Sequence, residues 1–421
     1  MLVTIKLRSE KDNWRIDDAV TELEELANAC GVEIADNIIC NCEKPTANLF
    51  IGKGKAEELT LISQEKNVDV LIFSHDLSGT QQRNLEEIVG KKTVDRTQLI
   101  LDIFARRAKT PTGRMQVELA QLQYLLPRLT GKGIILSRLG GGIGTRGPGE
   151  KKLEMDRRRL RGKIDNLKED LRGVALHRLT MKKKRKEHEL PTIALVGYTN
   201  AGKSTLINAL TQTNQIVSDG LFTTLDPLSK ILKLPNGENI VISDTVGFLR
   251  NLGHHLIEAF NATLEEAIGA DLLIHVLDVS SALAKEHSEV VLSVLKQLGI
   301  EQKPTITVLN KIDALTDEFW LSDLGENFPH SIHISAKLEK NLDSLLKAIQ
   351  EIFEPKMVDA QIAIAHSRMY LVDLFYREGK VREIKYLQKE IRIHANLPKA
   401  LYHKLLQNKE IIPIDNSQLI S

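Results

Sequence analysis

The stretch TIALVGYTNAGKST, residues 192–205, decides how the central part of this chain folds. An apolar run with strand character leads directly into the pattern G-x-x-x-x-G-K-S, and a helical pattern follows it. Backbone N–H groups of such a glycine-rich loop form a concave site for phosphate, so the motif predicts a P-loop between a buried strand and a helix. The residues expected to bind nucleotide here are Gly197, Tyr198, Thr199, Asn200, Ala201, Gly202, Lys203, Ser204 and Thr205.

Further strand-like runs at 240–243, 272–277 and 305–309 alternate with helical patterns on the carboxyl side of this loop. Such alternation predicts an α/β domain over residues 191–355, with a doubly wound and mostly parallel sheet. Within its P-loop we expect Lys203 to bridge the β- and γ-phosphates, and the Ser204 hydroxyl to ligate Mg²⁺.

A second motif, Asp244-Thr245-Val246-Gly247, stands at the end of the run 240–243. Asp244 can hold a magnesium-bound water, and the Gly247 N–H can meet the γ-phosphate, which makes the following segment a switch. Between the two motifs, Thr224 is expected to complete the magnesium shell and to sense the γ-phosphate. These two segments add nine residues to the predicted nucleotide site: Phe222, Thr223, Thr224, Leu225, Asp226, Asp244, Thr245, Val246 and Gly247. The expected metal ligands are Ser204, Thr224 and Asp244, and the expected catalytic residues are Lys203, Thr224 and Gly247.

The choice of base is predicted from two motifs that follow later strands. In Asn310-Lys311-Ile312-Asp313, the Asp313 carboxylate can accept hydrogen bonds from N1–H and N2–H₂ of guanine, a donor pair that adenine lacks. The Lys311 stem can cover the base, and Asn310 can tie this loop to the P-loop. In Ser335-Ala336-Lys337, the Ala336 N–H can meet guanine O6. The motifs together favour GTP over ATP at this site.

The rate of hydrolysis is expected to be low without a partner. Many regulatory GTPases place a water-orienting glutamine directly after the second motif, whereas this chain has Phe248, which cannot hydrogen-bond water. Arg250 or His254 could replace the glutamine, but we favour surface switch residues as their role. His275, inside the apolar run 272–277, is interpreted as a packed, hydrogen-bonded core histidine.

The rest of the chain is predicted to form three smaller parts. Residues 1–108 alternate short strands with amphipathic helices, among them 17–29, 80–89 and a helix that begins near Ala56 after Gly52-Lys53-Gly54-Lys55, a pattern typical of a small α/β domain. We favour a plain loop for that glycine pair over an anion site. Residues 109–190 are predicted to form a helical hairpin, and residues 356–421 a small C-terminal α/β domain without chemical motifs.

The predicted hairpin is strongly basic and carries a glycine-rich loop at 131–149. Apolar seams run from Met115 to Leu129 and from Leu153 to Val174. Pro127 is expected to kink or end the first helix, whereas the second could be wholly helical or interrupted at its glycines. Residues 106–190 hold 23 Lys/Arg against 9 Asp/Glu, a net charge of +14, whereas the remainder holds 34 against 47, a net charge of −13. The loop could be a flexible connector, but the local charge favours contact with RNA phosphates.

Composition excludes several other classes of protein. Aromatic residues make up only 4%, which argues against an RNA surface built on stacked rings. No apolar run approaches the roughly 18 residues of a membrane span, and the first ten residues lack a signal-peptide core, so we expect a cytoplasmic protein, with peripheral membrane attachment left open. The three cysteines, Cys30, Cys40 and Cys42, are expected to be free thiols.

Several motifs together resemble the HflX family of ribosome-associated GTPases. They are GGGIGTRGPGE at 140–150, LEMDRRR at 153–159, GYTNAGKST at 197–205, FTTLDP at 222–227 and DTVGF at 244–248. The resemblance extends over nearly the whole chain, is weakest after residue 355, and makes the aromatic Phe248 a family feature. One departure is Gly253, where relatives usually have proline.

The resemblance implies binding to the 50S ribosomal subunit and its rRNA, nucleotide-dependent release, and a role in ribosome splitting, rescue or biogenesis under stress. We expect a monomer that binds GTP or GDP, because the hairpin leaves no free seam. The alternative is an RNA-remodelling nucleotidase that also uses ATP through the N-terminal region, a site that the resemblance implies but no motif here supports. A third hypothesis is a non-enzymatic adaptor whose nucleotide only sets its conformation.

Overall fold

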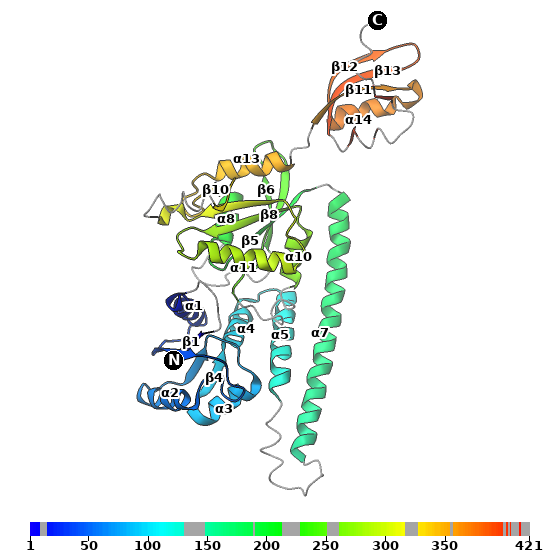
Figure 1. The fold of residues 1–421 in the computed structure, drawn as a ribbon. Coiled ribbons are helices and arrows are strands. Elements are labelled where there is room, and N and C mark those ends of the chain that lie inside the picture. Colours follow the sequence, from blue (N-terminus) through cyan, green and yellow to red (C-terminus); the bar gives the residue numbers. More distant parts are fainter. Residues whose placement is uncertain are drawn as a thin grey trace. The chain divides into compact units, whose positions relative to one another are not determined.

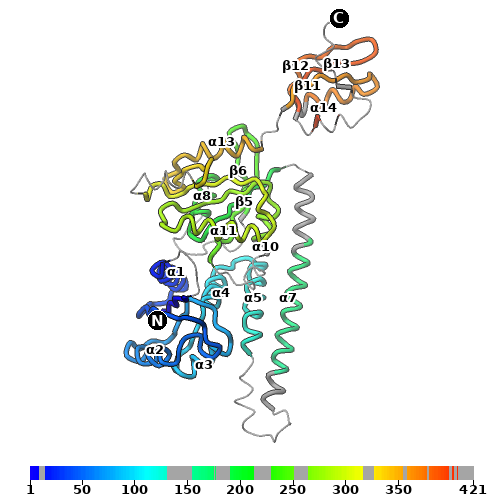
Figure 2. The backbone as a smooth tube through the Cα atoms, in the orientation of Figure 1, coloured from blue at the N-terminus to red at the C-terminus, as the bar shows by residue number. Residues whose placement is uncertain are grey.

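The computed structural model describes most of the chain, in eleven stretches: 1–8, 15–129, 148–187, 190–212, 228–250, 261–315, 327–353, 357–398, 401–402, 405 and 412–413. The chain divides into two compact units, Met1–Ser344 and Leu345–Ser421. Figure 1 shows the elements of both units, and Figure 2 follows the same chain as a tube. The mixed α/β architecture predicted from the sequence is confirmed.

The first part of the larger unit is a parallel four-stranded sheet with helices on both faces. Its strand order is β2-β1-β3-β4. Successive side chains of a strand point to opposite faces of the sheet. Leu2 and Ile72 pack with α1 and α4 on one face, whereas Val3 and Phe73 pack with α2 and α3 on the other. The elements are β1 (Leu2–Leu7), α1 (Ile16–Ala29), β2 (Asn37–Cys42), α2 (Lys53–Glu65), β3 (Val70–Phe73), α3 (Gly79–Val89), β4 (Lys92–Asp95) and α4 (Arg96–Arg107).

Helix α2 and the three cysteines of this sheet domain test two expectations from the sequence. Helix α2 begins at Lys53 with Gly52 as its N-cap, so the expected start near Ala56 was one turn late. Gly54 and Lys55 therefore lie in the first helical turn, and a Cβ at Gly54 would meet nothing within 4 Å. The three cysteines are free thiols, as expected.

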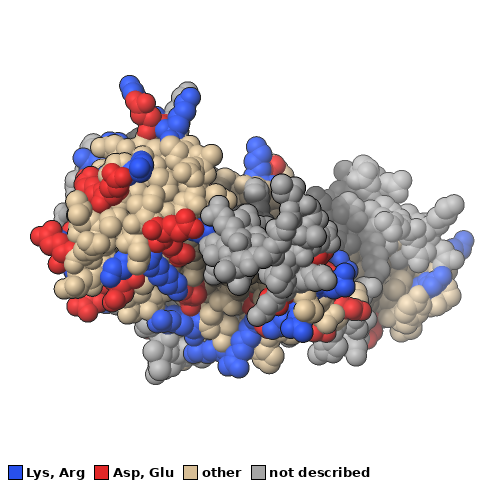
Figure 3. Space-filling view, turned by 90° about the horizontal axis from the view of Figure 1, so that it is seen from below, with Lys and Arg blue, Asp and Glu red and all other residues tan. Residues whose placement is uncertain are grey.

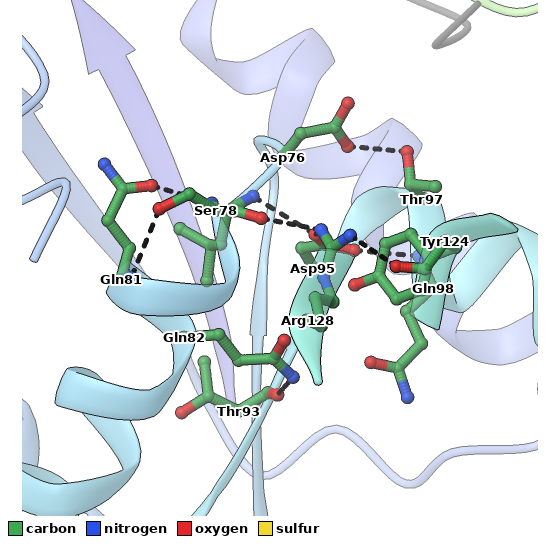
Figure 4. A network of polar contacts seen from close by, with 11 residues as sticks. Asp76, Ser78, Gln81, Gln82, Thr93, Asp95, Thr97, Gln98, Tyr124 and Arg128 are labelled. Atoms are coloured by element: carbon green, nitrogen blue, oxygen red, sulfur yellow. Dashed lines mark hydrogen bonds and ion pairs between the residues drawn. The ribbon is translucent and has the colours of Figure 1, made fainter. Parts of the chain in front are cut away.

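The end of the next helix, α5 (Pro111–Arg128), is tied to this sheet by a buried polar network. Arg128 Nη2 donates to Asp95 Oδ2 at 2.9 Å and to the Leu77 carbonyl oxygen at 2.6 Å (Figure 4). Its guanidinium also lies 3.4 Å from the centre of the Tyr124 ring. Asp95 is fully buried, and burial raises the pKa of its carboxyl group despite the hydrogen bond from the Gln98 N–H and the nearby Arg128.

Helices α5 and α7 (Pro148–Glu187) form the predicted antiparallel hairpin (Figure 1). Leu119 and Leu122 pack against Ile164 and Leu167, so the apolar seams meet as the spacing indicated. The sequence left open whether glycines interrupt the second helix, and α7 is continuous through Gly162 and Gly173. Glycine costs about 1 kcal/mol within a helix, which the long seam and the neighbouring turns outweigh. Residues 130–147, most of the glycine-rich loop, lie outside the described residues.

The second part of this unit is a six-stranded sheet with the order β10-β9-β8-β5-β7-β6. Strand β6 is antiparallel to β7 and the other pairs are parallel, so the predicted mostly parallel sheet is confirmed. Its strands are β5 (Thr192–Gly197), β6 (Leu228–Lys233), β7 (Asn239–Asp244), β8 (Leu272–Asp278), β9 (Thr305–Asn310) and β10 (Ile332–His333). The helices that accompany it are α8 (Lys203–Thr211), α10 (Asn261–Gly269), α11 (Ala284–Gln297), the short η1 (Ile312–Ala314) and, at the unit boundary, α13 (Leu342–Phe353).

The smaller unit contains an antiparallel sheet of order β12-β13-β11-β14, and helix α14 packs against this sheet. Phe375 of the helix is 1% exposed and packs with Ile362 and Ile393 of the sheet. The elements are β11 (Met357–Ile364), η2 (His366–Arg368), α14 (Tyr370–Glu378), β12 (Lys380–Tyr386), β13 (Ile391–Pro398) and β14 (Ile412–Pro413). Among the described residues of the whole chain, no helix is both long and apolar enough to cross a membrane.

Candidate nucleotide-binding site

The P-loop joins β5, a central strand of the six-stranded sheet, to the first turn of α8. Strands β5, β7, β8 and β9 run parallel, so their carboxyl ends meet at one edge, where ligands bind in open α/β sheets. Two glycines are required there. A Cβ at Gly197 would lie 2.3 Å from the Val276 carbonyl oxygen, and Gly202 has a φ of +90° with the Asn310 side chain equally close.

Lys203 is buried inside this loop, with only 6% of its surface exposed. Its Nζ donates to the carbonyl oxygens of Gly197 at 3.0 Å and Tyr198 at 2.8 Å. Burial lowers the pKa of Lys203 to about 8, against the opposing effect of Asp244. A phosphate beside this ammonium group would supply the anionic partner that a buried cation needs, in keeping with the proposed contact to the β- and γ-phosphates.

Ser204 and Asp244 meet at the start of α8, where the Ser204 hydroxyl donates to Asp244 Oδ2 at 2.7 Å. Asp244 is 1% exposed. A hydroxyl and a carboxylate oxygen at this spacing fit Mg²⁺, which takes one or two protein oxygens and completes its shell with phosphate and water. Within the described residues no group of three or more His, Cys, Asp or Glu could hold a metal by itself. The segment Phe222–Asp226, with Thr224, lies outside the described residues.

The second motif pairs with the P-loop through its backbone. Phe248 N–H donates to the Gly197 carbonyl oxygen at 3.1 Å, and its own carbonyl oxygen accepts from Thr199 N–H at 2.9 Å. A Cβ at Gly247 would lie 2.7 Å from Thr199 Cα, so only glycine allows this approach. Phe248 itself is 3% exposed and packs in the core. Phe248, at the position of the glutamine, thus connects the predicted switch segment to the P-loop through its backbone, and its side chain does not face water.

Asn310 connects the two predicted base-recognition loops to the P-loop. Its Nδ2 donates to the Ala201 carbonyl oxygen at 2.9 Å, and its Oδ1 accepts from the Ala336 N–H at 3.0 Å. The side chain is 1% exposed. The structure therefore brings together the three segments 197–205, 310–313 and 335–337, although the first lies more than 100 residues before the second in the sequence.

The Asp313 carboxylate lies beside the third of these segments and accepts a hydrogen bond from the Ser335 hydroxyl. Asp313 is exposed, so the carboxylate is accessible to a base. Lys311 adopts a φ of +68°, and its Nζ pairs with Asp278 Oδ2 at 2.7 Å. Asp278 was not predicted, although its place at the carboxyl end of β8 is a signal that could have identified it.

His275 is buried in β8 at 2% exposure, as the apolar run indicated. Burial, and after it the positive charge of Lys203, lowers the pKa of His275 to about 4. Its Nε2 has no hydrogen-bond partner among the described residues, so the expected hydrogen bond is not made by that nitrogen. Of the two candidate switch residues, Arg250 is described and partly buried, and His254 lies outside the described residues.

A mostly parallel sheet with a P-loop, an aspartate motif and an asparagine motif that is tied to the P-loop defines a P-loop GTPase. Family models agree segment by segment: "GTP-binding GTPase N-terminal" matches residues 17–105, "GTP-binding GTPase Middle Region" residues 107–185, and "50S ribosome-binding GTPase" residues 192–311. The chain belongs to the HflX family of GTPases and hydrolyses GTP.

Relatives named GTPase HflX match most of the chain. The one from Caldanaerobacter subterraneus subsp. tengcongensis is 46% identical, over 90% of this chain and 88% of its own. That from Lacrimispora saccharolytica is 42% identical over 97% and 96%, and that from Escherichia coli K12 is 39% identical over 90% and 88%. Among solved structures, a GTP-binding protein from Sulfolobus solfataricus in complex with GDP matches 83% of this chain and 98% of its own, at 24% identity and a TM-score of 0.43.

Proposed function

We propose that this GTPase is a nucleotide-controlled switch that binds the large (50S) ribosomal subunit and acts in ribosome splitting, rescue or biogenesis. The observation that carries the proposal is the basic helical hairpin of α5 and α7, which adds a concentrated positive charge to a nucleotide-binding unit. The description of the family model that matches residues 192–311 supports the same partner. Mg²⁺ at Ser204 and Asp244, with Thr224, is part of the proposal, as is a cytoplasmic, monomeric protein.

The charge of the hairpin is suited to a phosphate-rich partner. Arg158, Arg159 and Arg161 lie exposed close together on α7, and Lys168 and Arg172 are also exposed. On the face shown in Figure 3, acidic and basic side chains of the described residues are interspersed. The sequence places the excess of positive charge in the segment 106–190, which favours binding of RNA by that segment.

Hydrolysis measured with and without 50S subunits tests this proposal. We expect the subunits to stimulate GTP hydrolysis of the full chain, because a partner that orders the switch would supply what Phe248 does not. Replacement of Arg158, Arg159 and Arg161 by alanine should weaken binding. The slope of log affinity against log salt should fall by about one for each phosphate that the variant no longer neutralises.

The matched control replaces three exposed cations of the smaller unit, Lys380, Lys385 and Arg392, by alanine. This variant removes the same charge and should retain stimulation. If 50S subunits do not stimulate the unmodified protein, or if both triple variants are impaired equally, the proposed role of the hairpin is wrong.

A further inference from the structure

A closed ring of polar contacts joins the P-loop and the switch to the N-terminal sheet. The Tyr198 hydroxyl donates to Glu22 Oε2 of α1 at 2.9 Å and accepts from the Arg250 N–H at 3.2 Å. Arg96, the first residue of α4, donates from Nη1 to the Arg250 carbonyl oxygen at 2.5 Å. The second guanidinium nitrogen of Arg96 pairs with the Glu22 carboxylate, which closes the ring.

This ring is shielded from water. Tyr198 is 6% and Arg96 8% exposed, and the Tyr198 ring stacks on His287 of α11 with centroids 3.9 Å apart. Burial, and after it the Glu22 carboxylate, raises the pKa of the Tyr198 hydroxyl, so the group remains a proton donor. Exposed ion pairs contribute little to stability, but a buried network in which each member has its partner is rigid, and removal of one member leaves another unsatisfied.

The ring holds two segments that the nucleotide must engage. Tyr198 is the second residue of the P-loop, and its carbonyl oxygen accepts a hydrogen bond from Lys203. Arg250 follows Gly247 by three residues, and Phe248 between them pairs with Gly197 and Thr199. A shift of the Tyr198 ring would therefore move both an acceptor of Lys203 and the start of the switch.

We propose that Glu22 and Arg96, although they belong to the N-terminal sheet, are positioning residues of the nucleotide site that hold Tyr198 and Arg250 and thereby preorganise the P-loop. Neither residue needs to touch the nucleotide. A loop that is already ordered loses less conformational entropy when the ligand binds, so the ligand is bound more tightly and dissociates more slowly. By linkage, bound nucleotide must in turn stabilise the contact of α1 and α4 with this site.

Dissociation of a fluorescent GDP analogue from the full chain, followed by stopped flow without ribosomes, tests the proposal. Glu22→Gln and Tyr198→Phe should each accelerate dissociation by about 10-fold, the range expected when a buried hydrogen bond to a charged group is removed. The double variant should dissociate no more than about twofold faster than the faster single variant, because both changes open the same ring. Glu24→Gln is the matched control on the same helix, since the Glu24 carboxylate accepts a hydrogen bond from Asn37 of the N-terminal sheet and should leave the rate unchanged.

Amide hydrogen exchange distinguishes a positioning role of Glu22 and Tyr198 from a purely structural one, because a purely structural role would not change how GDP protects α1. GDP should slow exchange in Ile16–Ala29 of the unmodified protein and have little effect there in Tyr198→Phe. The proposal is overturned if both single variants release the analogue at the unmodified rate, or if their effects multiply and GDP protects α1 equally in all variants. Because no ribosome is present, either result is independent of the role proposed for the hairpin.

Discussion

The Asn310 carboxamide donates a hydrogen bond to the Ala201 carbonyl oxygen at 2.9 Å, so the loop expected to recognise the base is fixed to the loop expected to bind phosphate. The same side chain accepts from the Ala336 N–H at 3.0 Å. Three segments from different strand ends thus depend on one buried residue. Nucleotide affinity should be correspondingly sensitive to it.

Asn310→Ala removes both hydrogen bonds and leaves a buried carbonyl and a buried N–H without their partner. Each unsatisfied group costs about 1–3 kcal/mol, so we expect GTP and GDP affinity to fall at least about 30-fold. Isothermal titration with GDP measures the change. The control is Asn341→Ala, which removes an exposed hydrogen bond from the Asn341 side-chain amide to the His333 carbonyl oxygen. This variant should change affinity less than about threefold.

Asp313→Asn tests base recognition. The substitution replaces a carboxylate that can accept two hydrogen bonds with an amide that offers one acceptor and a mismatched donor. We expect affinity for GTP to fall by about 100-fold while affinity for ATP stays low, because the discrimination depends on guanine donors. Competition between GTP and ATP for the same fluorescent GDP analogue provides the measurement. Unchanged GTP affinity would remove Asp313 from the proposed site.

Arg128→Met should destabilise the larger unit by about 3–5 kcal/mol, since it leaves the fully buried Asp95 without its cation. Arg8→Met is the matched control, because the Arg8–Glu43 pair has side chains that are 81% and 82% exposed. Its effect should remain below about 1 kcal/mol. Urea unfolding of both variants gives the comparison, and equal effects would show that the network in Figure 4 does not anchor α5.

The buried imidazole of His275 predicts an acid dependence of stability. Its pKa is lowered to about 4 from an ordinary 6.5, by burial first and by Lys203 second. Below pH 6.5 the unfolded chain binds a proton that the folded chain does not, so His275 costs stability as the pH falls, by up to about 3 kcal/mol near pH 4. The difference in unfolding free energy between the unmodified protein and His275→Leu should shift by about that amount between pH 7 and pH 4. His333→Leu, a partly exposed histidine of the same sheet, is the control.

The sequence predicted those features that depend on local pattern. The order of strands and helices around the P-loop, the hairpin seam and the convergence of Asn310 with Ala201 and Ala336 follow from spacing and from the geometry of parallel strands. Tertiary packing overrode local preference where α7 continues through Gly162 and Gly173. The ring of Glu22, Arg96 and Tyr198 could not be predicted from the sequence. Glu22 and Tyr198 are 176 positions apart, and neither the helical pattern around Glu22 nor the P-loop motif indicates a contact with the other.

Guanine nucleotide is expected to govern the affinity of this protein for the ribosomal subunit. Co-sedimentation of the full chain with 50S subunits measures it most directly, in nucleotide-free, GDP-bound and GTP-analogue-bound states across a salt series. We expect the GTP-analogue state to bind most tightly, the GDP state to be released, and binding to fall steeply with salt. Equal binding in all three states would contradict the account.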